Sequence, residues 1–349
     1  MKRWLTLPCT LYFFLLSAQK HPDTISIIGV GDVMLGTSFP KKFLPPEDGR
    51  KLLAQVSPYL KNADLTFGNY EGTLFDGEGL PKKCADSLNC YAFKSPERYA
   101  LHLKTAGFSV MSVANNHSGD FGAEGRRRTM AVLKAAGVEA CGSEEQPFTV
   151  VEKNGIRYGI AAFAPNTGTP NINDYRSAKK IVSHLDSLCD IVLVSFHGGA
   201  EGLHRQHVPR ENELFLGENR GDVHRFAREV IDAGADVVFG HGPHVTRAVD
   251  IYKDRFIIYS LGNFATYGRF NLRKEAGIAP IVKVCVSRGG RFLKGEIVSV
   301  RQTGEGGPKL DSTSAVVRKL KKLTAQDFPD SDLVIDAKGR IKKVHKKKG

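Results

Sequence analysis

The sequence predicts an α/β protein with largely parallel sheets, and two patterns in its 349 residues carry this prediction. Short apolar runs alternate with stretches of helical periodicity, which is typical of βαβ units. Six of the apolar runs also end in clusters of Gly, Asn, Asp, Glu and His. Because open α/β sheets bind ligands just beyond the carboxyl ends of their strands, we expect these clusters to meet in one cleft.

The six predicted strands are short, apolar runs of the kind that is buried in a sheet. They span residues 25–30, 65–67, 110–114, 191–196, 237–239 and 257–261. The polar clusters that follow them contain Asp32, Asn69 with Glu71, Asn115-Asn116-His117, His197 with Glu201, His241 with His244, and Asn263.

Helical patterns separate these strands. Ser95 is a predicted N-cap because Pro96 follows it at the first helical position. Gly137 and Gly234 are predicted to end two of the later helices. The predicted helices span residues 48–60, 96–106, 122–136, 174–188 and 222–233.

Two stretches predict antiparallel hairpins, and therefore a second sheet or mixed sheet edges. Asn154-Gly155 joins strand-like runs at 148–153 and 156–163, which is a strong hairpin signal. A Gly-rich turn joins similar runs at 281–286 and 292–300.

Two long polar loops and a polar C-terminal region complete the chain. The loops span 76–93 and 164–173, and loops of this length often shape substrate access. Beyond Gln302 we expect a helix at 314–323 and a strand at 333–335. We therefore predict a core domain over residues 25–302 and a C-terminal extension over 303–349.

Residues 1–18 resemble an export signal, which predicts a location in the periplasm or cell envelope. Met1-Lys2-Arg3 is basic, residues 4–16 are mostly apolar, and Ser17-Ala18 offers small residues for cleavage. The apolar stretch is short for a membrane span, and Pro8 interrupts it. An uncleaved anchor or a buried first helix are the alternative interpretations.

The six cysteines fit an exported protein only weakly. Cys84 and Cys90 flank a short polar loop, and an oxidising compartment would let them form a disulfide, the alternative being two free thiols. Cys141, Cys189 and Cys285 lie in or beside apolar segments and are predicted to be packing residues.

The basic character of the chain is concentrated at its C-terminus. The net charge is +13, but residues 338–349 hold seven Lys or Arg and no acid. This tail could hold the protein on a membrane surface or a polyanionic product by charge, or it could be a disordered terminus. A nucleic-acid partner is disfavoured, because the tail lacks interleaved aromatic residues.

The polar clusters predict a metal site. Carboxylate, imidazole and amide oxygen are the side-chain groups that hold transition metals in proteins. Three His residues after two separate strands, together with Asp32 and Glu71, favour such a site over isolated structural residues. In the Asn115-Asn116-His117 cluster an amide could bind the metal while His117 donates a proton to a leaving group. Asp120 could then orient His117.

In order along the chain, these motifs resemble those of the CapA family of poly-γ-glutamate capsule biosynthesis proteins. The resemblance covers about residues 25–300 and is highly specific. The motifs are GDVMLG at 31–36, GNYEGTL at 68–74, VANNHSGDFG at 113–122, HGGAE at 197–201, GHGPHV at 240–245 and YSLGNF at 259–264.

The family is related to calcineurin-like metallophosphoesterases. The resemblance therefore implies a four-layer α/β/β/α sandwich and one or two divalent metals (Mn, Fe or Zn). It also implies the proton-donor role for His117, and we expect Asn69, Glu201 and Asn263 to contact substrate. The implied metal contacts are Asp32, Glu71, Asn116, His197, His241 and His244.

The match departs from the phosphoesterase pattern at three places. Met34 stands where that pattern has His, and Glu71 stands where it has a bridging Asp. The last motif, at residues 240–244, has one extra residue and a Pro. These departures predict either a depleted metal site or one that selects a different metal.

The leading hypothesis is an exported, CapA-type metal-dependent hydrolase of the cell envelope. It would act on a phosphoester or a γ-glutamyl amide in the biosynthesis of capsule or poly-γ-glutamate. Its expected partners are a polyanionic polymer or precursor and a capsule synthesis or export complex. Met34 and the basic tail motivate the alternative, a non-catalytic component that binds the polymer.

Overall fold

The structure is a computed structural model that describes residues 24–83 and 91–344. The predicted export signal at 1–18, the Cys84–Cys90 disulfide and the last tail residues, 345–349, lie outside the described residues. Cys141, Cys189 and Cys285 are free thiols, and the first and last of these are buried as predicted.

The first sheet combines a parallel half with an antiparallel half. Strands β1, β2, β5 and β6 run parallel, and β16 joins β1 in antiparallel orientation. Strands β17, β20 and β19 continue the antiparallel half, while β15 and β18 pair with β1 and β17. The strands are β1 Thr24–Met34, β2 Leu65–Tyr70, β5 Val110–Ser112, β6 Glu139–Cys141, β15 Asn263–Thr266, β16 Ile278–Ser287, β17 Phe292–Arg301, β18 Lys309–Leu310, β19 Leu333–Ile335 and β20 Arg340–Lys343.

The second sheet has four parallel strands between two antiparallel edge strands, in the order β13-β14-β12-β9-β8-β7. Asn154 and Gly155 both adopt positive φ in the β7–β8 turn, which confirms the predicted hairpin. The strands are β7 Phe148–Lys153, β8 Ile156–Phe163, β9 Ile191–His197, β12 Val237–His241, β13 Thr246–Tyr252 and β14 Arg255–Leu261. Two short ribbons pair β3 Thr73–Leu74 with β4 Lys94–Ser95, and β10 Leu214–Phe215 with β11 Glu218–Asn219.

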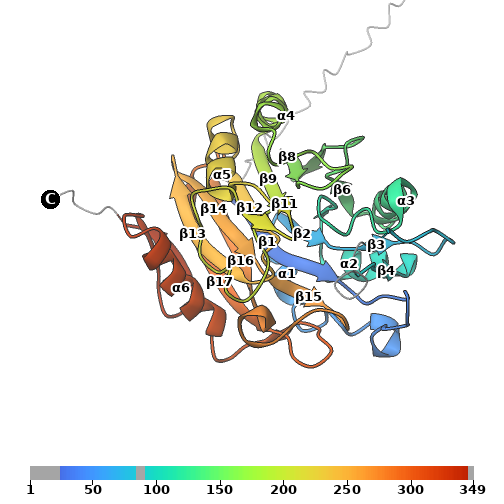
Figure 1. The fold of residues 1–349 in the computed structure, drawn as a ribbon. Helices are drawn as coiled ribbons and strands as arrows, with labels where there is room; N and C mark the ends of the chain where they lie inside the picture. The colour runs from blue at the N-terminus through green and yellow to red at the C-terminus, as the bar shows by residue number, and fades with distance from the viewer. Residues whose placement is uncertain (1–23, 84–90, 345–349) are drawn as a thin grey trace, which may run out of the picture.

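The two sheets pack face to face, and helices cover their outer faces (Figure 1). Phe67 of β2 meets Phe239 of β12 between the sheets, with ring centroids 6.1 Å apart. Helices α2 Ala100–Ala106 and α3 Gly122–Ala135 pack on the first sheet, and α4 Tyr175–Leu188 and α5 Val223–Asp232 pack on the second. This arrangement confirms the predicted four-layer α/β/β/α sandwich.

The predicted starts of the two helices in the second half of the core are confirmed. The carboxylates of Asp174 and Asp222 accept hydrogen bonds from the backbone N–H groups of Ser177 and Arg225 and cap α4 and α5. Each cap satisfies one of the N–H groups that a helix start leaves without an intrahelical partner.

Two local predictions are wrong. Residues 48–60 do not form one helix, because Glu47 and Asp48 adopt positive φ in the short 3₁₀ helix Pro46–Gly49, and only Ser57–Leu60 (α1) is α-helical. Ser95 is not an N-cap. Its hydroxyl donates to the carbonyl of Gly36 at 2.6 Å, and Pro96 precedes the 3₁₀ turn Glu97–Tyr99 that leads into α2.

The region beyond residue 302 packs on the preceding chain. It contains α6 Ala315–Asp327 and β19, as predicted, and β20 pairs with β17. In Figure 1, α6 borders the sheets beside β13. The first part of the basic tail therefore forms a strand, and Lys343 in it pairs with Asp254. The domain boundary at 302 stays a prediction.

Within residues 24–83 and 91–344, no helix combines the length and the hydropathy needed to cross a membrane.

Candidate metal centre

The first and last motifs lie side by side at the carboxyl end of β1. Asp32 is in register with Asn263 of β15, and its N–H donates to the carbonyl of Gly262 at 2.9 Å. The register of β1 shifts beside Asp32, and irregularities of this kind often redirect a side chain near a functional site. A Cβ on Gly31 would lie 1.8 Å from the Gly262 oxygen, so this close approach requires glycine.

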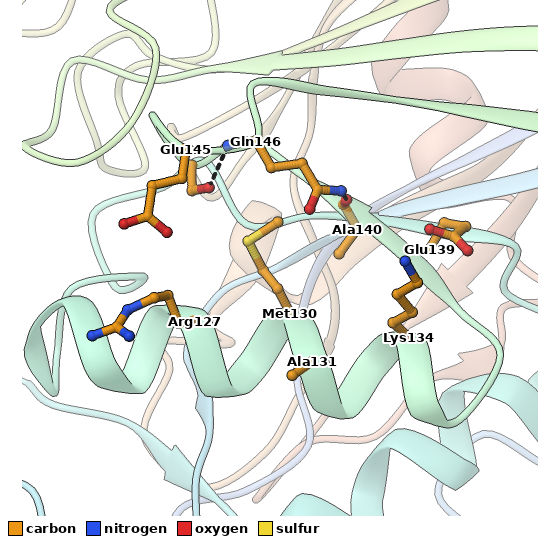
Figure 2. A pocket seen from close by; sticks show the side chains of 9 residues that line it. Arg127, Met130, Ala131, Lys134, Glu139, Ala140, Glu145 and Gln146 are labelled. Carbon is orange, nitrogen blue, oxygen red and sulfur yellow. Dashed lines mark hydrogen bonds between the residues drawn. The ribbon is translucent and has the colours of Figure 1, made fainter.

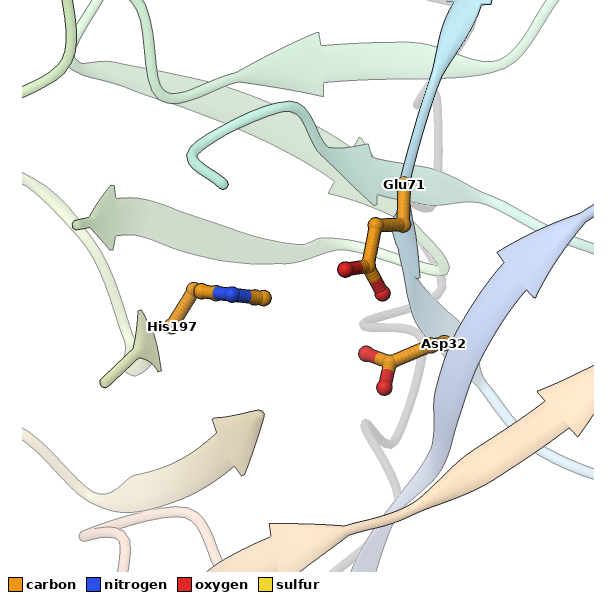
Figure 3. Close-up of side chains that lie close together, drawn as sticks. All are labelled: Asp32, Glu71 and His197. Atoms are coloured by element: carbon orange, nitrogen blue, oxygen red, sulfur yellow. The ribbon is translucent and has the colours of Figure 1, made fainter. Parts of the chain in front are cut away.

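Asp32, Glu71 and His197 form the centre of the site. They come from β1, from the segment after β2 and from the end of β9. One possible ligand atom of each lies within 4.8 Å of the other two. Figure 3 shows the His197 ring facing the two carboxylates. All three side chains are buried, so three clusters that are distant in sequence converge on one point.

His241 and His244 join this centre. His241 is in register with His197 on the neighbouring strand, and its Nδ1 lies 3.4 Å from Asp32 Oδ1. His244 Nδ1 lies 3.1 Å from Asp32 Oδ2, and its Nε2 lies 3.6 Å from Glu71 Oε1. His244 also has a φ of 58°, a conformation that is uncommon outside glycine and concentrates at functional sites.

Several buried polar atoms here have no hydrogen-bond partner among the residues that the structure describes. They are both carboxylate oxygens of Glu71 and both ring nitrogens of His197 and of His241, and Oδ1 of Asn116, elsewhere in the predicted ligand set, is unpaired as well. A buried polar atom left unpaired costs about 1–3 kcal/mol, and native proteins retain few. The gathering of unpaired carboxylate and imidazole atoms therefore fits a bound cation.

The electrostatics of the centre agree with this fit. Burial raises the pKa of Glu71 well above its usual range, and the charge of Asp32 adds to the effect. Burial would also raise the pKa of Asp32, but its contacts with His241 and His244 hold that pKa well below its usual range. Burial lowers the pKa of His197, which keeps its imidazole neutral and able to donate a lone pair.

His244 behaves differently from His197. Burial would lower its pKa, but the Glu71 charge and the contact with Asp32 outweigh burial and raise the pKa to about 10. Without a metal, the site therefore balances its carboxylates with a protonated His244. A divalent cation would replace that positive charge, and the donor set of carboxylate and imidazole suits Zn, Fe or Mn.

A chain of hydrogen bonds links the metal centre to His117. Asn69 Nδ2 donates to Asp32 Oδ1 at 2.9 Å, and Asn115 Nδ2 donates to Asn69 Oδ1 at 3.0 Å. The His117 N–H then donates to Asn115 Oδ1 at 3.0 Å. Both Asn side chains are fully buried, so they position Asp32 and His117. The substrate contact expected of Asn69 stays a prediction.

Asp120 lies against His117, in the position needed to orient it. Asp120 Oδ2 lies 2.9 Å from His117 Nδ1 and accepts from the Phe93 N–H at 2.7 Å. Since the carboxylate accepts, we assign the proton to Nδ1 of His117, which leaves Nε2 for exchange with a substrate. Lys82 Nζ lies 2.6 Å from Asp120 Oδ1, and it also donates to the backbone oxygen of Asn116 at 3.4 Å.

Glu201 and Asn263 border a pocket of about 290 Å³ beside the metal centre. Glu201 Oε1 accepts from Arg220 Nη2 at 2.9 Å, and Asn263 Oδ1 lies 3.0 Å from His244 Nδ1. The other walls are largely apolar and include Leu203, Phe215, Pro243, Val245 and Phe270. The pocket places both residues where a substrate could reach them, and their substrate contacts stay predictions.

A buried ion pair holds the loop that carries Glu201. Arg247 of β13 is fully buried, and its Nη1 and Nη2 lie 2.6 and 2.8 Å from the two carboxylate oxygens of Glu213. Glu213 Oε2 also accepts from the Ala200 N–H at 3.0 Å. The pair therefore fixes the backbone directly before Glu201.

Sequence reasoning gave no role to Arg247, Glu213 or Lys82, and no individual role to Asn115. Asn115 lies inside a recognised motif, which is a usable signal. Lys82 lies in a long polar loop, and Arg247 and Glu213 lie in no recognised cluster, so local sequence offered no sign of their partners.

A separate hollow of about 260 Å³ lies between α3 and the segment from β6 to Gln146 (Figure 2). Met130 of α3 points toward Gln146 there, between Arg127 and Lys134. None of the predicted site residues lines this hollow in the part of the chain that the structure describes.

Comparison with known proteins identifies relatives. Residues 26–267 match the family described as "Bacterial capsule synthesis protein PGA_cap". Capsule biosynthesis protein CapA of Bacillus anthracis is 31% identical over 267 residues, covering 70% of this chain and 61% of that protein. PGA biosynthesis protein CapA of Bacillus subtilis (strain 168) is 26% identical over 258 residues, covering 69% and 63%. The chain therefore spans less than two thirds of the length of these relatives.

Among solved structures, purple acid phosphatase PPD1 from yellow lupin seeds aligns with a TM-score of 0.40 and 12% identity, covering 84% of this chain and 55% of that one. Because this likeness is weak, the fold assignment rests on the topology of the chain itself. The family match is strong by contrast, since it spans more than half of the sequence and contains all six ordered motifs. The chain belongs to the bacterial capsule synthesis protein family, as its motifs predicted.

Proposed function

We propose that this protein is a metal-dependent hydrolase that acts at the cell envelope during the synthesis of a capsule polymer. The observation that carries the proposal is that buried, unpaired carboxylate and imidazole atoms of Glu71, His197 and His241 converge beside Asp32. The names of the relatives supply the biological setting, and the basic, apolar and small-residue order of residues 1–18 supports export.

Asp32, Glu71, His197 and His241 would hold the metal. Asn116 would add an amide oxygen, and His244 would approach through Nε2. When bound, a divalent cation polarises a phosphoryl or carbonyl oxygen and activates water. Asp32 would stay in place through its hydrogen bond with Asn69.

His117 would hold the proton that the leaving group takes up. Asp120 fixes its ring by accepting from Nδ1, and Phe93 packs on the ring with centroids 4.4 Å apart. Water would add across the bond that breaks, either P–O or C–N, and His117 would protonate the departing oxygen or nitrogen. The apolar pocket beside Glu201 would hold the part of the substrate next to that bond.

The test is to purify the full chain, measure its metal content and assay it with Mn, Fe or Zn added. Phosphodiester, phosphomonoester and γ-glutamyl amide substrates distinguish the two bond types. We expect bound metal and turnover of one substrate class, and we expect His117→Ala to lower kcat by about 10²–10⁴-fold without loss of metal.

The matched control is His184→Ala, because His184 is exposed on α4 in the outer layer of the molecule. This variant should keep full turnover. A chain that binds no metal and turns over none of the substrates would refute the proposal. Full activity in the His117→Ala variant would refute the assigned proton donor.

A further inference from the structure

The end of the first sheet that lies away from the metal centre carries a basic hollow. Strands β16, β17 and β20 form it, and its volume is about 320 Å³. The charged residues that line it are Lys283, Lys294, Glu296, Arg340 and Lys342. Four of these side chains are exposed, and Lys283 is half-buried.

Strand register places these side chains on one face. Lys283 lies opposite Glu296, which lies opposite Arg340 on the next strand, and Cys285 lies opposite Lys294. Side chains alternate between the two faces of a strand. The neighbouring residues of β16, Val282, Val284 and Val286, belong to the core between the sheets. The basic face is therefore the outer face of the sheet.

Most of the positive charge on this face is not neutralised. Arg340 pairs with Asp336 at 2.6 Å. Lys283, Lys294 and Lys342 lie within 4.0 Å of no carboxylate in the described ranges 24–83 and 91–344. Glu296 is the acidic residue of the lining.

The pocket at the metal centre has the opposite character. Its walls are largely apolar, and its charged groups are Glu201 and His244. A chain with a carboxylate on every repeat would bring its negative charges against Glu201 and apolar side chains there. The basic hollow offers such a chain unpaired ammonium groups from neighbouring strands. The strands themselves lie about 5 Å apart.

The hollow is distinct from the metal centre in space. Cys285, in its lining, lies opposite Ser26 of β1, six residues before Asp32. At about 3.3 Å per residue, the two sites are about 20 Å apart along the strand. A polymer held at the hollow would stay bound while one end of it, or another substrate, occupies the metal centre.

We propose that the outer face of β16, β17 and β20 is a docking site for a polyanionic carboxylate polymer of the poly-γ-glutamate type. This proposal rests on the proposed function for the choice of polymer and on the unpaired lysines for the site. A recessed site favours a flexible chain over a flat bilayer, because a chain can enter the hollow, whereas a planar surface reaches only its rim.

The test measures binding of end-labelled poly-γ-glutamate to the full chain by fluorescence anisotropy. The face variant is Lys283→Gln with Lys294→Gln and Lys342→Gln. The matched control is Lys309→Gln with Lys321→Gln and Lys322→Gln, three exposed lysines elsewhere that make no ion pair within the described part of the chain. Both variants lose the same charge. We expect the face variant to bind about tenfold more weakly and the control to bind almost as the parent does.

Equal loss in the two variants would overturn the proposal in favour of general charge attraction. Full affinity in the face variant would also overturn it, as would binding to phosphatidylglycerol vesicles without binding to the polymer. Turnover of a small substrate separates this proposal from the hydrolase proposal. The face variant should keep that turnover, and a parent chain that binds polymer but hydrolyses nothing would refute only the hydrolase.

Discussion

Two groups of buried charged residues in the described part of the chain differ in how their charges are satisfied. Arg247 and Glu213 form a bidentate pair, and Glu213 also accepts from the Ala200 N–H. Arg247 Nε donates further to the backbone oxygen of Arg205 at 2.7 Å. Glu71 and His197, in contrast, have no hydrogen-bond partner for either polar atom among the residues described.

The presence or absence of hydrogen-bond partners distinguishes buried charged residues that stabilise the fold from those that are available to bind a ligand. A buried ion pair with complete hydrogen bonding can be part of a stable fold without any ligand. Buried groups that lack partners reduce stability unless something else binds them. The Arg247–Glu213 pair thus completes the fold, whereas the unpaired groups around Glu71 fit a bound cation.

The largest effect expected from this comparison is in the structural pair. Glu213→Gln leaves the Arg247 guanidinium buried without a carboxylate, so we expect a loss of about 3–5 kcal/mol in the free energy of unfolding. Chemical denaturation measures this loss. A double variant, Arg247→Met with Glu213→Leu, should recover much of the stability because it removes both charges. A Glu213→Gln variant as stable as the parent would contradict the structural role.

The same chemical change at Glu71 should have the opposite result. Glu71→Gln removes a buried carboxylate that accepts no hydrogen bond from the described residues, so the metal-free protein should be as stable as the parent or more stable. Metal affinity should fall more than about 100-fold, because even residues that only position a ligand change affinity by about 10–100-fold. Calorimetric titration with Mn, and denaturation in chelator, measure the two quantities.

The comparison fails if Glu71→Gln destabilises the metal-free protein as strongly as Glu213→Gln does. Glu71 would then be a structural residue. The two variants form a matched pair, since each exchanges one buried carboxylate for an amide of nearly the same shape.

The sequence predicted most strands and two helix starts well, because these depend on local patterns, whereas the four layers were implied by the family resemblance. Asp174 and Asp222 begin helices through their own side chains, and Asn154-Gly155 turns a hairpin through its own backbone. Residues 48–60 failed because helical spacing of apolar residues does not reveal that Glu47 and Asp48 adopt positive φ. Tertiary contacts decide that conformation, and periodicity does not report them.

The candidate site was predictable as a set of motifs but not as a network. Strand-end positions predicted that Asp32, Glu71 and His197 meet, and they do. The roles of Asn115 and Lys82 could not be predicted, since each depends on a side-chain contact across the fold. Arg247 lies on a strand among apolar neighbours, where a charged residue ordinarily predicts an exposed position.

A third buried group, His224, sharpens the comparison with the smallest expected effect. Its ring lies beside the stacked pair Tyr259 and Phe328, with centroids 6.2 and 6.1 Å away, and its Nε2 has no hydrogen-bond partner within residues 24–83 and 91–344. Burial lowers the pKa of His224 to about 4, and Arg228 and Arg210 add to the effect. Unlike His197, it belongs to no group of possible metal ligands among the described residues, so it tests what one unpaired ring does alone.

Because the folded pKa of His224 lies below the unfolded value of about 6.5, the unfolded chain binds a proton first as the pH falls. Its contribution to stability is complete above about pH 6.5 and declines toward pH 4, by about 3 kcal/mol in total. His224→Phe keeps the stacked ring and removes the proton site, so this variant should lose correspondingly less stability between pH 7 and pH 4.5. Denaturation curves for parent and variant across that range measure the difference. If the stability of parent and variant changes equally with pH, the unpaired nitrogen is hydrated. Burial alone would then not mark a functional group, and the convergence of histidines with carboxylates would be what distinguishes the candidate metal centre.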